Sequence, residues 1–271
     1  MAKNDQWDWA GRFSQDWLPE GLSITIDAQT VGEQIDRMRG FLQLQQVYRG
    51  AIREITTKLE TLDAEFHVRY EHNPIHHINS RLKSPQSILE KLKRKGVEPS
   101  IEAAREYLTD IAGVRVICNY VEDIYHIADI VENQSDITLV AKRDYIANPK
   151  PNGYRSLHLI VKVPVFLSNH TENIPVEIQI RTIAMDFWAT LEHELRYKSQ
   201  MDMSDELRIR LKQCAETSSW LDHEMQAIRS QCIGKDKDDG GCSISPDGSG
   251  GKPNRLPHTS WLEGAGRPHV E

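Results

Sequence analysis

Apolar residues in the first part of the chain recur every three or four positions, the spacing of an amphipathic helix, from Val31 to Phe66. The residue before a proline avoids helical backbone angles, so Pro74 predicts that this helix ends or bends just ahead of it. Shorter helices are predicted over 85–95, where Gly96 stops the helix, and over 101–107. No strand is predicted before residue 113.

Short stretches rich in β-branched and apolar residues predict strands over 113–120, 137–140, 157–165 and 176–181. A helix over 121–132 separates the first two. In the last stretch, apolar residues alternate with Glu177, Gln179 and Arg181, so these three polar side chains share one face of a strand. Strands interleaved with helices predict an α/β or α+β domain with a mixed sheet, and of the two we expect the α+β class, a mixed β-sheet flanked by helices.

Two further amphipathic helices follow the predicted strands. The first, over 183–197, has one apolar face typical of packing on a core, formed by Phe187, Trp188, Leu191 and Leu195. The second, over 205–228, has a heptad-like seam in alternating steps of four and three, formed by Leu207, Leu211, Cys214, Ser218, Leu221, Met225 and Ile228. This seam packs either on its own domain or on another copy of the chain.

The two ends of the chain differ in composition from the middle. Residues 233–271 hold 8 of the 16 glycines and 4 of the 12 prolines, which predicts a disordered C-terminal tail. Residues 1–29 carry three tryptophans among polar residues, which favours a loosely ordered extension that docks on the domain over a partner-binding segment. The folded domain is therefore predicted over 30–232.

Composition narrows the classes of function. The formal net charge is −7 and the isoelectric point is near 5.9, which argues against a surface that binds nucleic acid throughout but allows a local basic pocket. No apolar run approaches the ~18 residues of a membrane span, and the first residues lack the apolar segment of a secretory signal. The four cysteines are scattered without a CxxC pair, which predicts a reducing, cytoplasmic location.

Positive charge is concentrated between residues 81 and 95, where six Lys or Arg residues accompany one Glu. Arg81 and Lys83 precede the predicted helix and Ser87 lies in its first turn. A helix N-terminus attracts anions, so this segment could bind a polyphosphate. Taken alone, the segment is more typical of a solvated basic face.

A second basic segment, 142–158, contains two prolines and the turn Asn152-Gly153, which Tyr154 follows directly. A stiff basic loop that ends in an aromatic residue suits a nucleotide, because the ring can stack on a base while cations hold phosphates. For Tyr154 alone, ordinary packing is an equally good interpretation.

Two carboxylates stand at the predicted strands. Asp110 precedes the strand at 113–120, and Glu177 lies on the strand at 176–181, so together they could hold Mg²⁺ between substrate phosphates. The alternative is that Glu177 and Arg181 only neutralise neighbours across the sheet. A zinc site built from His72, His76 and His77 is a weaker hypothesis, because the spacing is generic and a further ligand would have to come from elsewhere, His193 being one candidate.

Four segments carry a resemblance to a known family: HNPIHHINSRLKSPQSILEKLKRKG, DIAGVRVIC, DYIANPKPNGYRSLHLIV and VEIQIRTIAMDFWATLEHELRYK. They resemble the single-domain small alarmone synthetases of the RelA/SpoT family. The sequences NPKPNGYRSLHL and RTIAMDFWA look closest to the RelP-type branch. The resemblance spans roughly residues 31–230 and implies a nucleotidyltransferase-like synthetase domain with N- and C-terminal helical extensions. It also implies the reaction, a transfer of the β,γ-pyrophosphate of ATP to the 3′-hydroxyl of GDP or GTP that releases AMP.

The resemblance further implies roles for individual residues. Asp110 and Glu177 would be the catalytic carboxylates and the ligands of Mg²⁺. The ATP-binding residues would be Arg81, Lys83, Ser87, Lys91, Arg94 and Arg115, with the adenine held between Arg81 and Arg115. The residues around GDP or GTP would be Arg143, Lys150, Asn152, Tyr154, Arg155, His158 and Gln179. Similar enzymes are tetramers joined through terminal helices, so a homotetramer is expected, with neither membrane nor nucleic acid as partner.

Two other functions fit parts of this pattern. A related toxin would transfer pyrophosphate to adenine nucleotides or to tRNA 3′ ends, with a changed acceptor pocket. A non-catalytic nucleotide sensor or RNA-binding module would not need Asp110 or Glu177. Longer relatives carry a hydrolase domain built on a His-Asp dipeptide, and the sequence contains no such dipeptide. We therefore expect synthesis without degradation.

Overall fold

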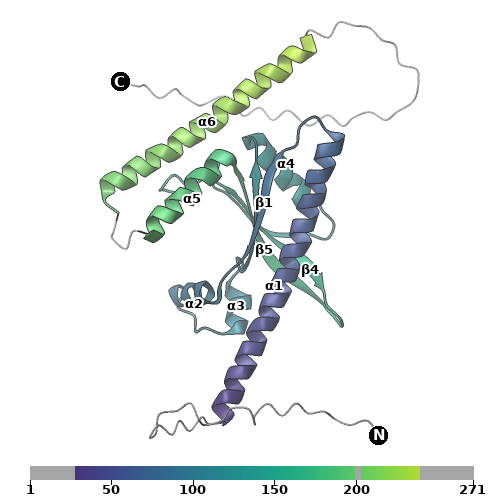
Figure 1. The fold of residues 1–271 in the computed structure, drawn as a ribbon, viewed down its shortest axis with the longest axis vertical. Helices are drawn as coiled ribbons and strands as arrows, with labels where there is room; N and C mark the ends of the chain where they lie inside the picture. The colour runs from purple at the N-terminus through teal and green to yellow at the C-terminus, as the bar shows by residue number, and fades with distance from the viewer. Residues whose placement is uncertain (1–27, 199–202, 239–271) are drawn as a thin grey trace, which may run out of the picture. The chain divides into compact units, whose positions relative to one another are not determined.

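The computed structural model describes residues 28–198 and 203–238 (Figure 1), and the described residues as far as Ile228 belong to one compact unit. The strands are β1 (Ile75–Leu82), β2 (Ala112–Cys118), β3 (Thr138–Asp144), β4 (Leu157–Phe166) and β5 (Thr171–Thr182). The helices of the described part are α1 (Ala28–Arg69), α2 (Pro85–Arg94), α3 (Ile101–Tyr107), α4 (Val121–Glu132), α5 (Ile183–Lys198) and α6 (Asp205–Asp238). Most of the predicted extension (1–29) and of the predicted tail (233–271) lies outside the described residues. Where the structure does describe them, α1 already begins at Ala28 and α6 continues to Asp238, so the first residues of the predicted disordered tail are helical.

The strands form one mixed sheet in the order β1-β2-β5-β4-β3. Strands β2 and β5 run parallel, and the other neighbouring pairs run antiparallel. The α+β class with a mixed sheet and flanking helices, predicted from the sequence, is confirmed. Within the described residues, no helix is both long and apolar enough to span a membrane.

One face of the sheet belongs to the main hydrophobic core. Val114 and Val116 of β2, Leu159 of β4 and Ile178 and Ile180 of β5 all lie on it and are buried. Helices α1 and α4 contact this sheet and contribute their apolar stripes to the same core (Figure 1). The alternation predicted for the last strand therefore leaves the odd-numbered residues of β5 on the opposite face.

Strand β1 was not predicted, and its bulge explains why. Its apolar residues, Ile75, Ile78 and Leu82, are spaced three and four apart, which is not the period of a strand. Ile75 pairs with Cys118 and His77 pairs with Ile117, so an extra residue interrupts the ladder between them. A bulge of this kind shifts the alternation by one position, and the strand therefore lacks the period-2 signal.

Helix α5 differs from the expectation of a helix with one buried face. Trp188 is 5% exposed and packs with Ala189 and Ala215, which lies on α6. Phe187 is 64% exposed, and Leu191 and Leu195 are exposed as well. The prediction that these residues pack on the chain's own core is wrong for three of the four, because α5 touches the sheet mainly through its first turns.

Candidate active site

The strand register places polar residues from all five strands on the second face of the sheet. Gly113 of β2 pairs with Glu177, and Arg115 pairs with Gln179. On the far side of β5, His158 of β4 pairs with Gln179. Arg143 of β3 pairs with His158, and Arg81 of β1 pairs with Gly113. Predicted site residues that are far apart in sequence thus meet on one surface.

Five side chains at the centre of this surface form a closed ring of hydrogen bonds. The Tyr154 hydroxyl lies 2.8 Å from Nε2 of His158, and Nδ1 of His158 lies 3.2 Å from Oε1 of Glu177. Gln179 donates to Oε2 of Glu177 at 2.9 Å. Nη2 of Arg181 closes the ring, donating to Oε1 of Gln179 at 2.8 Å and to the Tyr154 hydroxyl at 2.9 Å. A carboxylate only accepts hydrogen bonds, so Nδ1 of His158 donates to Glu177.

The ring determines the charge state of Glu177. Burial by itself would raise the pKa of this carboxyl, but the hydrogen bonds from His158 and Gln179 outweigh burial and hold the pKa below its ordinary value. The charge of nearby Asp110 acts in the opposite direction and raises it. Glu177 is therefore an ionised carboxylate near neutral pH, held in one orientation and close to a second carboxylate.

That second carboxylate, Asp110, lies just before β2 and between two lysines. Its Oδ2 accepts from Nζ of Lys83 at 2.7 Å and from Nζ of Lys91 at 2.6 Å. Burial by itself would raise the pKa of Asp110. The hydrogen bonds and charges of the two lysines outweigh burial and hold the pKa below its ordinary value. Oδ1 is buried and has no hydrogen-bond partner among the described residues. This cluster therefore offers two cations and one free carboxylate oxygen at the same point.

Helix α2 presents its N-terminus beside this cluster. Ser84 caps the helix by accepting from the Ser87 backbone amide at 3.2 Å, and its hydroxyl donates to that of Ser87 at 2.9 Å. Ile88 and Leu92 are buried, which fixes the helix against the core, whereas Leu89, expected to face inward, is exposed. Of the remaining predicted ATP-binding residues, Arg94 and Arg81 are exposed to solvent and Arg115 is half-buried.

The loop between β3 and β4 carries the predicted acceptor residues. Gly153 has a φ of +91°, and a Cβ there would lie 2.6 Å from that of Ala215, so the predicted tight turn requires glycine. Asn152 accepts from the Tyr154 backbone amide at 3.2 Å and donates to Glu192 at 3.2 Å. The exposed Lys150 ammonium lies 4.6 Å from the centroid of the Tyr154 ring.

Arg155 is placed differently from the other predicted acceptor residues. Its Nη1 donates to the backbone carbonyls of Gly153 at 3.1 Å and Ala215 at 3.4 Å. With Trp188 and Ala215 it lines a small hollow between the loop, α5 and α6. The structure therefore brings Arg155 to the α5–α6 side of the loop and not into the ring around Glu177.

Sequence reasoning missed three residues of this surface. Arg181 was noted as a polar residue of the strand but not as a site residue, and it is 4% exposed and completes the ring. Asp186 was considered only as a favourable charge at a helix start, and it accepts from Nη1 of Arg181 at 3.1 Å. The Tyr145 ring lies edge-on to His158, with centroids 5.2 Å apart. The signal available in the sequence for Arg181 was the strand alternation, which places it on the same face as Glu177 and Gln179.

The histidines of the zinc hypothesis lie in different surroundings. Nε2 of His72 lies 3.0 Å from Asp123, and Nε2 of His77 lies 3.1 Å from Asn79. Among the described residues, no group of three or more His, Cys, Asp or Glu side chains is arranged to hold a metal ion. The placement of these histidines therefore does not support the zinc hypothesis.

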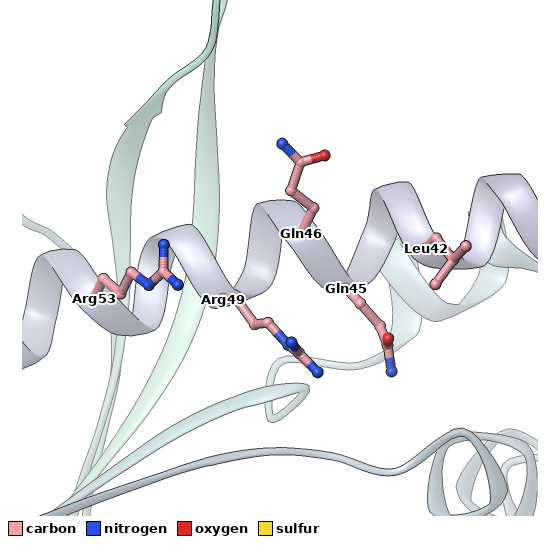
Figure 2. A pocket seen from close by; sticks show the side chains of 5 residues that line it. All are labelled: Leu42, Gln45, Gln46, Arg49 and Arg53. Atoms are coloured by element: carbon pink, nitrogen blue, oxygen red, sulfur yellow. The ribbon is translucent and has the colours of Figure 1, made fainter.

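A surface depression on α1 is a separate feature. It is lined by Leu42, Gln45, Gln46, Arg49 and Arg53, all from one helix (Figure 2). It contains no carboxylate, and the buried residues of α1 face the core side of the sheet. The depression therefore lies away from the polar face and does not belong to the candidate active site.

Comparison with known proteins gives consistent matches. The family model described as "Region found in RelA / SpoT proteins" matches residues 80–202. The GTP pyrophosphokinase YwaC of Bacillus subtilis is 46% identical over 185 residues, which covers 68% of this chain and 88% of that protein.

Two solved structures extend this result to the fold. The small alarmone synthetase 1 of Bacillus subtilis bound to its product pppGpp superimposes with a TM-score of 0.66 at 38% identity, covering 70% of this chain and 97% of that one. The same enzyme bound to AMPCPP superimposes with a TM-score of 0.62 at 35% identity, covering 71% and 97%.

Proposed function

Because the chain belongs to the RelA/SpoT family of alarmone synthetases, we propose that it is a (p)ppGpp synthetase. It transfers the β,γ-pyrophosphate of ATP to the 3′-hydroxyl of GDP or GTP and releases AMP. The bond from Pβ to the oxygen that bridges it to Pα breaks, and a bond from the acceptor 3′-oxygen to Pβ forms. The proton of the acceptor hydroxyl must leave. The observation that carries the proposal is the ionised Glu177 carboxylate, held by the ring beside the Asp110 cluster.

The donor nucleotide is assigned to the side of Asp110. Lys83 and Lys91 supply two positive charges at this point. The N-terminus of α2, with Ser87, adds backbone amides that favour phosphate. Arg94 lies in the last turn of the same helix, where it can contact the phosphates. Arg81 and Arg115, on neighbouring strands, are assigned to the two sides of the adenine.

The acceptor nucleotide is assigned to the side of Tyr154. Its ring can stack on guanine once the base takes the place of the Lys150 ammonium that lies over it. Arg143 and His158 pair across β3 and β4 beneath this ring, and Asn152 and Gln179 complete the pocket. Arg155 supports the loop from behind, on the α6 side.

Glu177 accepts the proton from the acceptor hydroxyl, and the ring keeps its carboxylate oriented for that transfer. The family implies Mg²⁺, and the residues fit it, because Oδ1 of Asp110 is buried without a hydrogen-bond partner in the described part of the chain. Asp110 and Glu177 would hold the ion, and hard cations prefer such oxygens. When bound, it would neutralise negative charge on the transferred pyrophosphate.

The test is incubation of the chain with ATP and Mg²⁺ and one acceptor at a time, followed by separation of the nucleotides. GDP and GTP should each be tried, which also measures the preference between them. We expect ppGpp or pppGpp and an equal amount of AMP. Product formed only with adenine nucleotides or tRNA would instead identify the toxin-type enzyme, and no transfer to any acceptor would refute the synthetase.

We also propose a homotetramer in which the seam of α6 forms part of a subunit contact. Leu221 is 49% exposed, and Leu207, Met225 and Ile228 of the same seam are exposed as well. Exposed apolar rows of this kind mark interaction surfaces. Leu221→Asp would bury a carboxylate in the contact, so the variant should run as a smaller folded species in light scattering. A wild-type monomer, or a variant of unchanged mass, would refute this.

A cytoplasmic location is proposed on chemical grounds. Cys118, Cys214 and Cys232 are free thiols in the described part of the chain. Free thiols persist in reducing compartments, where ATP and GTP are also abundant. Fractionation of the producing cells would test the location.

A further inference from the structure

Asp186, in the first turn of α5, holds two arginines through a single oxygen. Its Oδ1 accepts from Nη1 of Arg115 at 3.1 Å and from Nη1 of Arg181 at 3.1 Å. Arg115 comes from β2 and Arg181 from the end of β5, so one carboxylate joins two neighbouring strands at the start of a helix. The N-terminal position on α5 favours the negative charge of Asp186.

The two arginines belong to different halves of the surface. Arg115 lies on the side assigned to ATP. Arg181 reaches the other side, because its Nη2 donates to the Tyr154 hydroxyl at 2.9 Å. A continuous path of hydrogen bonds and ion pairs therefore runs from Arg115 through Asp186 and Arg181 to Tyr154.

Asp186 holds the Nη1 group of both guanidiniums, whereas Nη2 of Arg181 is held separately by Gln179 and Tyr154. Nε of Arg115 and Nε of Arg181 are both buried and have no hydrogen-bond partner among the residues described. In the described part of the chain, the Arg115 guanidinium is held by Asp186 through Nη1. The two cations also repel each other: burial lowers the pKa of Arg181, and the neighbouring charge of Arg115 lowers it further while Asp186 and Tyr154 act to raise it.

We infer that Asp186 is a positioning residue that couples the two nucleotide sites, so that ATP bound against Arg115 strengthens binding of the acceptor at Tyr154. This inference rests on the proposed function, which assigns the two nucleotides to these sides. An ATP molecule that orders Arg115 also orders Asp186, and through Arg181 it orders the Tyr154 ring before the acceptor arrives. By linkage, the acceptor must strengthen ATP binding by the same factor.

The test measures the dissociation constant of GDP by calorimetry on the full chain, with and without saturating AMPCPP, an ATP analogue that does not react. The ratio of the two constants is the coupling factor, and the reciprocal titration must return the same factor. For the wild-type chain we expect tighter GDP binding with the analogue, by a factor of about 5 or more. A wild-type factor below about 2 would overturn the inference.

Three variants locate the coupling. Asp186→Ala should reduce the factor to nearly 1, because both arginines lose their shared acceptor. Asp186→Asn should give an intermediate factor, since its amide oxygen can still accept from both arginines without the charge. Asp205→Ala, which removes a first-turn carboxylate from α6, should leave the factor at the wild-type value. A wild-type factor in both Asp186 variants, or an equal loss in Asp205→Ala, would refute the role.

A merely structural role for Asp186 predicts a different result. It would weaken the binding of each nucleotide measured alone and lower the melting temperature, while the factor between the two stayed the same. If Asp186→Ala does not fold, Asp186→Asn decides the question. Product formation by the wild-type chain is measured alongside. A wild-type chain that synthesises product but shows no coupling refutes the inference alone, whereas a wild-type chain without synthesis refutes the proposed function.

Discussion

The two faces of the same five-stranded sheet have opposite chemistry. Val176, Ile178 and Ile180 of β5 lie on one face, inside the main core, and are fully buried. Between them, Glu177 and Gln179 lie on the other face and belong to the hydrogen-bonded ring. Adjacent residues of one strand therefore serve packing and polar chemistry in alternation.

The difference shows how the polar face can be partly buried without losing its charges. A buried ionised group is costly unless it is paired and hydrogen-bonded. Here Glu177 has His158 and Gln179 as partners, and Arg181 has Asp186 and Tyr154. The core face supplies stability through area alone, whereas the polar face depends on specific partners, so substitutions on the two faces should fail in different ways.

The largest expected effect is on the polar face. Glu177→Gln keeps the side-chain volume but removes the charge that accepts the proton, so the rate of pyrophosphate transfer should fall by ~10²–10⁴. ATP binding measured by calorimetry should survive, because the lysines around Asp110 are untouched. Glu172→Gln, on the same strand but paired with Arg105, is the matched control and should keep near-normal turnover. Near-normal turnover in Glu177→Gln itself would refute the assignment.

The core face should respond in the opposite way. Leu159→Ala removes a fully buried side chain of β4, and substitutions of this kind cost ~2–5 kcal/mol of the free energy of unfolding. The folded fraction of the variant should keep its turnover per molecule, since the side chain points away from the ring. Chemical denaturation measures the first effect and active-site titration the second. A lower turnover per folded molecule without a loss in the free energy of unfolding would contradict the separation of the two faces.

The core face was the part of the fold that the sequence could predict. Period-2 alternation identified β5, a stretch rich in β-branched and apolar residues identified β4, and the helix over 101–107 agrees with α3. Strand β1 was hidden because its bulge places Ile75 and Ile78 three positions apart. The strands β3 and β5 extend beyond the predicted ends, since their outer residues are mostly polar or exposed and Ile174 of β5 is an isolated buried apolar residue before Pro175.

The polar face was predictable only in part. The types and spacing of residues indicated which side chains share the surface, and the resemblance supplied roles for them. The ring itself depends on strand register, which pairs His158 with Gln179 and Gly113 with Glu177 and cannot be read from local sequence. Asp186 meets Arg115 only because β5 leads directly into α5 beside β2.

Tyr154 has two roles that substitutions can distinguish: its aromatic face can stack on a base, and its hydroxyl belongs to the hydrogen-bonded ring. Tyr154→Ala should weaken the binding of GDP or GTP far more than that of ATP, because stacking of one base is worth ~1–3 kcal/mol. Tyr154→Phe keeps the aromatic face but removes the hydroxyl that Arg181 and His158 share, so it should bind guanine nucleotides nearly as tightly as the wild type. Calorimetric titration of each nucleotide checks both. If the ATP constant changes most in Tyr154→Ala, the two nucleotides have been assigned to the wrong sides.

The smallest effect concerns pH and again contrasts two kinds of carboxylate. The pKa values of Glu177 and Asp110 lie below their ordinary 4.5 and 3.8, so the stability that these groups contribute is present above those values and is lost as pH falls. Asp222 of α6 has the opposite shift. Burial raises its pKa above 3.8, against the lowering effects of its hydrogen bond from Thr182, at 2.7 Å, and of nearby charges.

Burial of Asp222 makes the pH dependence of its contribution to stability opposite to that of Glu177 and Asp110. A carboxyl whose pKa is higher in the folded state contributes stability that is complete below 3.8 and disappears as pH rises through the folded value. Asp222→Asn cannot ionise and still offers an oxygen to Thr182, so its melting temperature should rise relative to wild type between about pH 4 and pH 7. Glu216→Gln, on the exposed side of α6, should show no such trend. A constant difference between Asp222→Asn and wild type across this range would mean that burial does not control the titration of Asp222. The opposite trend, with the wild type gaining on the variant as pH rises, would place Asp222 with the partnered carboxylates of the polar face.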